Sequence, residues 1–126
     1  MEAIVKSFDR PDEAGELPKG HAQIVRLGDQ LVIRGELEPG WRWSNDWQPI
    51  MGTASCQLPH TGVVLSGHWH FEMDDGYGFD LGPGDAYAIP PGHDAWVVGD
   101  EPVRTIDWAP AHDHATEGAI DAATSG

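Results

Sequence analysis

Cysteine, basic residues and long apolar runs are all scarce in this chain of 126 residues. The single cysteine, Cys56, excludes an internal disulfide framework and favours a reducing compartment. Seven lysines and arginines stand against 21 aspartates and glutamates, which gives a formal net charge of −14. Such a chain has little with which to neutralise a phosphate backbone or an anionic lipid surface. We therefore expect no nucleic-acid partner and no membrane partner.

No apolar run approaches the roughly 18 residues that a membrane span requires. The first six residues, MEAIVK, lack the charged and then apolar layout of a secretory signal peptide. Hydrophobic residues make up 40% of the chain, which is enough for one buried core at this length. These features predict a small, acidic, cytoplasmic domain.

Glycine and proline are abundant, with 16 and 10 residues spread along the chain rather than gathered in a linker. This density leaves little room for helices of ordinary length and favours short strands joined by turns. No stretch before residue 110 repeats apolar residues with the helical period over three turns. About nine or ten short strands, at intervals of about 8–12 residues, predict a single all-β domain, either a closed barrel or a double-sheet jelly roll.

The barrel is expected to occupy residues 22–110. Residues 1–21 predict an N-terminal arm with room for one docking strand. Residues 41–49 predict an aromatic-rich loop, and residues 50–58 predict the strand that follows it. Residues 111–126 are small and polar, which is typical of a mobile tail.

The segment LGPGDAYAIPPG, residues 81–92, resembles the second conserved box of the cupin superfamily, in which glycine, five residues, proline, any residue and glycine follow one another. Residues 63–67 are similar to the end of the first cupin box, and Pro39 and Gly40 stand where cupins carry a Pro-Gly pair. The resemblance covers about residues 22–108 and implies a cupin barrel, affinity for a divalent metal and a homodimer. Shorter matches resemble small bacterial cupin-domain proteins, most of which have no assigned reaction.

Metal-binding cupins use a His-x-His pair, then an acidic, amide or histidine ligand, and finally a late histidine. Counted back from Gly67, the resemblance places the first three positions on Ala54, Cys56 and His60. It places the late histidine position on Ala95. Alanine binds no metal, so the resemblance does not imply a standard four-ligand site here.

His93 offers a replacement for the late histidine, because residues two apart in a strand share a face and His93 therefore points the same way as Ala95. Cys56, His60 and His93 would then form a three-ligand set with one open position, as a catalytic metal site requires. A thiolate with two imidazoles suits zinc or iron better than magnesium or calcium, and nickel and manganese stay open. The same residues also fit a metal-free core, in which Cys56 is a small buried hydrophobe.

A second histidine pair, His68 and His70, imitates the glycine-x5-His-x-His opening of the first cupin box. The apolar residues that alternate with this pair, Trp69 and Phe71, should face the core. We therefore expect both histidines to point outward, unless a bulge at Gly67 shifts the alternation.

Other candidate site residues surround the expected barrel mouth. The predicted substrate wall consists of large aromatic side chains and one cation: Trp41, Trp43, Trp47, Trp96 and Arg42. Asp46 and Asp94 are spare carboxylates for acid–base catalysis or for orienting a histidine ligand.

Three functions are compatible with these residues. The first is a metal-dependent enzyme of the dioxygenase, lyase or isomerase class that acts on a small molecule. The second is a non-catalytic module, with or without a metal, that binds or senses a small molecule, which the two alanines favour. The third uses Cys56 as a nucleophile with His60 as its base, although Pro59 interrupts the strand between them.

Overall fold

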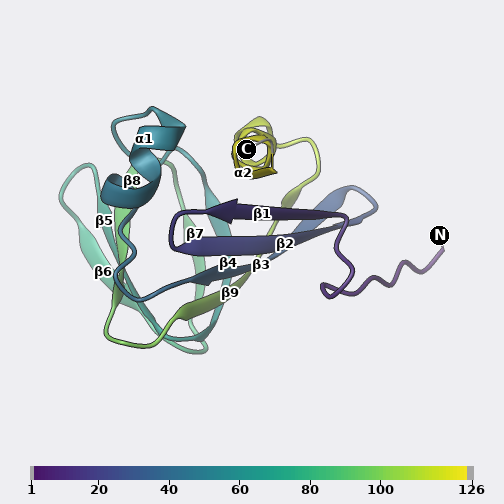
Figure 1. Cartoon of the computed structure of the whole chain (residues 1–126), viewed down its shortest axis with the longest axis horizontal. Coiled ribbons are helices and arrows are strands. Elements are labelled where there is room, and N and C mark those ends of the chain that lie inside the picture. Colours follow the sequence, from purple (N-terminus) through teal and green to yellow (C-terminus); the bar gives the residue numbers. More distant parts are fainter. Residues whose placement is uncertain (1, 125–126) are drawn as a thin grey trace.

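The computed structural model describes residues 2–124, and the described chain contains nine strands in two antiparallel sheets (Figure 1). The larger sheet contains, in spatial order, β1 (Glu13–Leu17), β2 (Gly20–Leu27), β3 (Gln30–Leu37), β9 (Val103–Pro110), β4 (His60–Ser66) and β7 (Ala86–Ile89). The smaller sheet contains β6 (Gly78–Leu81), β5 (His68–Met73) and β8 (His93–Val98). This arrangement confirms the predicted all-β jelly roll.

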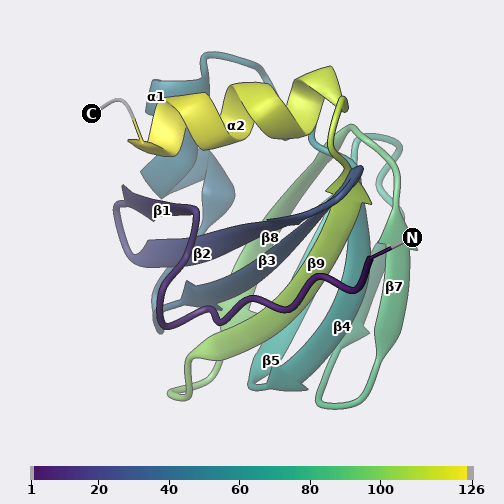
Figure 2. The same cartoon turned by 90° about the vertical axis from the view of Figure 1, so that its right-hand side faces the viewer.

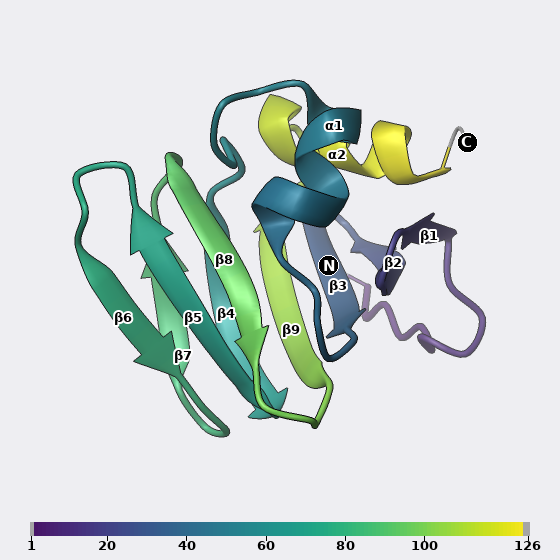
Figure 3. The ribbon, with the colours of Figure 1, turned by 60° about the vertical axis from the view of Figure 1, so that its left-hand side comes forward.

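The two sheets face each other, and the apolar side chains of their inner faces form the core (Figure 3). In β5, Trp69 and Phe71 are buried, whereas His68 and Glu72 are exposed. This alternation is typical of a strand that turns one face to the core and the other to solvent. Inward side chains of both sheets therefore meet between the layers, where the site described below lies.

The N-terminal boundary lies earlier than predicted. β1 is the docking strand expected within the N-terminal arm, and it pairs along its whole length with β2. The β2 strand itself begins at Gly20, two residues before the predicted start of the barrel. Residues 2–12 form no strand, so the arm is shorter than the predicted residues 1–21.

The segment predicted as a loop and then a strand is helical instead. A single π-helical turn, η1 (Trp43–Trp47), continues into α1 (Gln48–Met51). The Asp46 carboxylate accepts a hydrogen bond of 2.9 Å from the backbone N–H of Arg42, which fixes the start of the turn. Gly52, with φ of 76°, ends the helix in the left-handed conformation that glycine adopts readily. The expected strand over residues 50–58 is thus wrong and is reduced to one bridge between Cys56 and His93.

The C-terminal segment is also not the mobile tail that its composition predicted. It forms α2 (His114–Thr124), whose first turn is capped by the carboxylate of Asp113. Glu117 forms a salt bridge of 2.9 Å with Arg26 of β2. Ile120 is 5% exposed and packs in one cluster with Ile24 and Leu31. Residues 125–126 of the predicted tail lie outside the described residues.

The helical segments lie at the same end of the double sheet, where η1 contacts β8 and α2 lies beside β1 (Figures 1 and 2). α2 makes contacts with both β1 and α1. Within residues 2–124, no helix combines the length and apolar character needed to cross a membrane.

We expect Ile120→Ala to lower the free energy of unfolding by about 2 kcal/mol, because it removes buried apolar volume where α2 meets the sheet. Urea denaturation followed by tryptophan fluorescence measures this change. The matched control is Asp121→Ala, an exposed neighbour on the same helix, which should stay within about 0.5 kcal/mol of the parent chain. Equal stability of the Ile120→Ala variant and the parent chain would show that α2 is not docked.

Candidate functional site

Three predicted ligands come together between the sheets. Cys56 precedes β4 in an irregular segment, His60 is the first residue of β4 and His93 is the first residue of β8. One ligand atom from each side chain lies within 4.8 Å of the other two. Cys56 is 7% exposed and His93 is 1% exposed, so these side chains are shielded from bulk water.

His93 is held in one orientation and one tautomer. Its Nδ1 lies 2.9 Å from the carbonyl oxygen of Pro90, which can only accept a hydrogen bond. Nδ1 therefore carries the hydrogen, and the neutral ring keeps a lone pair on Nε2. This Nε2 is buried and has no hydrogen-bond partner among the described residues. An unpartnered buried polar atom costs about 1–3 kcal/mol, a penalty that a bound cation would remove.

Asp107 is a site residue that the sequence analysis does not identify. Its Oδ2 lies 3.6 Å from His60 Nδ1, and its Oδ1 accepts a hydrogen bond from the hydroxyl of Tyr87. Gly62 leaves space for this carboxylate, because a Cβ there would collide with Asp107. Asp107 shares an inward face of β9 with Val103, so period-two alternation along this strand is the signal that would have found it.

The cluster favours opposite charges on its sulfur and nitrogen atoms. Burial opposes ionisation of the Cys56 thiol, but the neighbouring His60 and His93 outweigh it and lower its pKa to about 6. Burial likewise opposes protonation of His60, but Asp107 and Cys56 raise its pKa to about 9. Cys56 Sγ and His60 Nε2 lie 4.0 Å apart despite the intervening Pro59. At neutral pH the metal-free cluster therefore holds a thiolate beside an imidazolium.

A cavity of about 420 Å³ adjoins this cluster and reaches α1 and α2. Trp41, Trp43 and Trp47 of the predicted substrate wall line it, and Trp69 and Phe71 contribute further aromatic surface. The rings of Trp41 and Trp47 meet edge to face, with centroids 5.0 Å apart. Small residues of α2 complete the lining.

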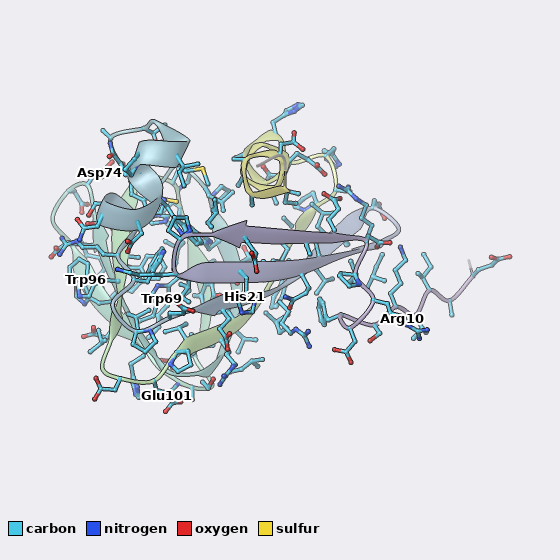
Figure 4. The ribbon with its side chains drawn as sticks, viewed as in Figure 1. Arg10, His21, Trp69, Asp74, Trp96 and Glu101 are labelled. Atoms are coloured by element: carbon cyan, nitrogen blue, oxygen red, sulfur yellow. The ribbon has the colours of Figure 1, made fainter. Side chains whose placement is uncertain are left out.

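Four other predicted site residues do not reach the cavity. Asp94 and Trp96 alternate with the buried residues of β8 and lie on its outer side, where Figure 4 shows Trp96. There the Arg42 guanidinium lies 4.3 Å from the centroid of the Trp96 ring, and Asp94 accepts hydrogen bonds from Arg42 and Ser44. Asp46 caps η1 and pairs with Lys19 at 3.3 Å.

The two alanines at expected ligand positions differ in their surroundings. Ala95 is buried and lines the cavity, whereas Ala54 is exposed. The outward orientation expected for His68 and His70 is confirmed: His68 is exposed, and His70 Nδ1 lies 2.7 Å from Asp80 on the outer face.

We expect the Cys56 thiol of the metal-free protein to titrate with a midpoint near pH 6, well below the roughly 8.5 of an unperturbed cysteine. The thiolate is then present at pH 7 and disappears as the pH falls through 6. Ultraviolet absorbance of the thiolate, taken as the difference from Cys56→Ala, measures the midpoint.

His60→Gln should raise that midpoint, because it removes the nearest positive charge. A parent midpoint above about 8 would contradict the described electrostatics.

The chain was compared with protein families, curated proteins and solved structures. A scan against protein-family models finds no match, and a search of curated proteins finds none either. Among solved structures, ectoine synthase from P. lautus aligns with a TM-score of 0.68 at 12% identity, over 96% of this chain and 87% of that one. The polyketide cyclase RemF from Streptomyces resistomycificus aligns with a TM-score of 0.59 at 21% identity, over 89% of this chain and 81% of that one. A cupin-superfamily sugar phosphate isomerase from Silicibacter pomeroyi aligns with a TM-score of 0.58 at 18% identity, over 83% of this chain and 74% of that one.

These identities are too low to carry an activity from one chain to the other, but the alignments span most of each molecule. They agree with the two facing antiparallel sheets and with the two sequence boxes described above. The chain therefore has the fold of the cupin superfamily.

Proposed function

We propose that Cys56, His60 and His93 bind one divalent transition metal ion, and that the protein acts on a small molecule held in the adjacent cavity. The observation that carries this proposal is the buried, unpartnered Nε2 of His93 beside the Cys56 sulfur and the His60 ring. A nitrogen lone pair and a sulfur donor that meet in a buried space fit a cation better than they fit an ordinary core.

The donor set narrows the identity of the metal. One thiolate with two imidazoles suits zinc or iron, and nickel or manganese less well, whereas magnesium and calcium prefer oxygen ligands. When bound, such an ion would supply Lewis-acid chemistry, or redox chemistry in the case of iron.

The protein's own groups would orient the ligands. The Asp107 carboxylate holds a proton on Nδ1 of His60, which leaves the Nε2 of this ring facing Cys56. The Pro90 carbonyl holds the proton of His93 on Nδ1, which leaves its Nε2 available as a donor atom. Ala95 follows His93 by two residues on the same inner face. Its methyl group stands where the resemblance places a fourth ligand, so this position is open to a small molecule.

Asp107 takes the acid–base role that the sequence analysis gave to Asp46 and Asp94, because it lies beside His60 and lines the cavity. The candidate reaction classes stay those of a dioxygenase, a lyase or an isomerase. The structural neighbours named above are a synthase, a cyclase and an isomerase, which is consistent with small-molecule chemistry. The homodimer and the cytoplasmic location stay predictions.

We expect freshly purified, tag-free protein to contain about one transition metal ion per chain, measured by inductively coupled plasma mass spectrometry. Cys56→Ala and His93→Ala should each lose the ion, because each removes a donor atom. Asp107→Asn should weaken zinc binding about tenfold by releasing His60 from its carboxylate.

His68→Ala is the matched control, since it removes a histidine from the outer face and should keep the parent stoichiometry. A parent protein that holds no metal and takes up no zinc on dialysis would contradict the proposal. That result would favour the alternative of a metal-free binding or sensory module.

A further inference from the structure

The cavity lacks the side chains that recognise anions. Among its described lining residues there is no lysine and no arginine, while Glu36 and Asp107 are acidic. Two lining histidines already face acidic or sulfur groups: His60 lies 3.6 Å from Asp107 and 4.0 Å from Cys56, and His21 lies 2.7 Å from Glu36. In the metal-free protein, a carboxylate or phosphate would therefore enter a site without a free compensating charge, in a chain of net charge −14.

Two indole donors of the same wall lack a partner. Trp41 and Trp69 are 3% and 5% exposed, and neither Nε1 has a hydrogen-bond acceptor within the described part of the chain. The Nε1 of Trp47 differs, because it donates to the Pro18 carbonyl at 2.8 Å. An indole N–H can only donate, so Trp41 and Trp69 require an acceptor atom. Their unmet need points to a ligand that carries an oxygen acceptor.

The rest of the lining is largely apolar. Ile24, Leu37, Phe71 and Ile120 contribute aliphatic and aromatic surface. A volume of about 420 Å³ falls within the roughly 300–1,000 Å³ of small-molecule sites. A polyhydroxylated ligand such as a sugar would leave many hydroxyl groups against these apolar walls without partners.

We propose that the cavity binds an uncharged, ring-containing carbonyl compound, whose ring packs on the tryptophans and whose carbonyl oxygen accepts a hydrogen bond from Trp41 or Trp69. As the substrate class of the metal site, this ligand class rests on the proposed function. The recognising groups belong to the aromatic wall, however, so binding is measurable in the metal-free protein.

Three bicyclic probes of similar size test the inference. α-Tetralone carries a carbonyl group, and tetralin is the same ring system without it. Tetralin-1-carboxylate carries a negative charge instead. Isothermal titration of each into EDTA-treated protein should show α-tetralone binding about tenfold more tightly than tetralin, the scale of one hydrogen bond to an otherwise unpartnered donor. The carboxylate should bind at least about tenfold more weakly than α-tetralone. Equal binding of α-tetralone and tetralin, or tighter binding of the carboxylate, would overturn the inference.

Trp41→Phe and Trp69→Phe test the donors directly, since each removes an N–H but keeps an aromatic ring. At least one of them should bring the affinity ratio of α-tetralone to tetralin close to one. Trp47→Phe is the matched control, because its N–H is already engaged, and it should keep the ratio. A ratio unchanged in both test variants would overturn the assignment of the donors.

Zinc uptake by the same preparations separates this inference from the proposed function. Zinc uptake without a preference for the carbonyl probe overturns the ligand class alone. A preference for the carbonyl probe without zinc uptake supports the ligand class and counts against the metal.

Discussion

One short stretch of backbone pairing, between Cys56 and His93, determines the geometry of the site. The Cys56 N–H donates to the His93 carbonyl at 2.8 Å, and the Gly92 N–H donates to the Cys56 carbonyl at 2.8 Å. These two bonds fasten an otherwise irregular segment to the start of β8 and bring the thiol beside the imidazole. Without them, Cys56 would lie on an unpaired connection between α1 and β4, with nothing to hold it in the core.

Charge compensation makes this pairing chemically useful. His60 lies between a carboxylate and a thiol, so burial does not drive it neutral as it would drive an isolated histidine. His93 is anchored by a neutral carbonyl and keeps an unpartnered lone pair. The two histidines are therefore held by different partners, yet each offers a ligand atom beside the sulfur. The cavity next to them is lined by elements far apart in the sequence, namely η1, β5 and α2.

The inward set of strand residues was predictable because period-two alternation is local. It correctly placed His93 and Ala95 inside, and it placed His68 and His70 outside. Applied consistently, the same rule puts Trp96 outside and Asp107 inside, so the inclusion of Trp96 and the omission of Asp107 were avoidable. The helical segments were not predictable in this way. η1 and α1 together are too short to show a period, and α2 depends on docking of Ile120 and on a salt bridge to a strand about ninety residues away.

X-ray absorption at the zinc edge of zinc-loaded protein reports the atoms bound to the ion. We expect one sulfur neighbour at about 2.3 Å and two imidazole nitrogens at about 2.0–2.1 Å, with any further neighbour a light atom from solvent or ligand. A first shell without sulfur, or one that keeps its sulfur in Cys56→Ala, would contradict the proposed metal site.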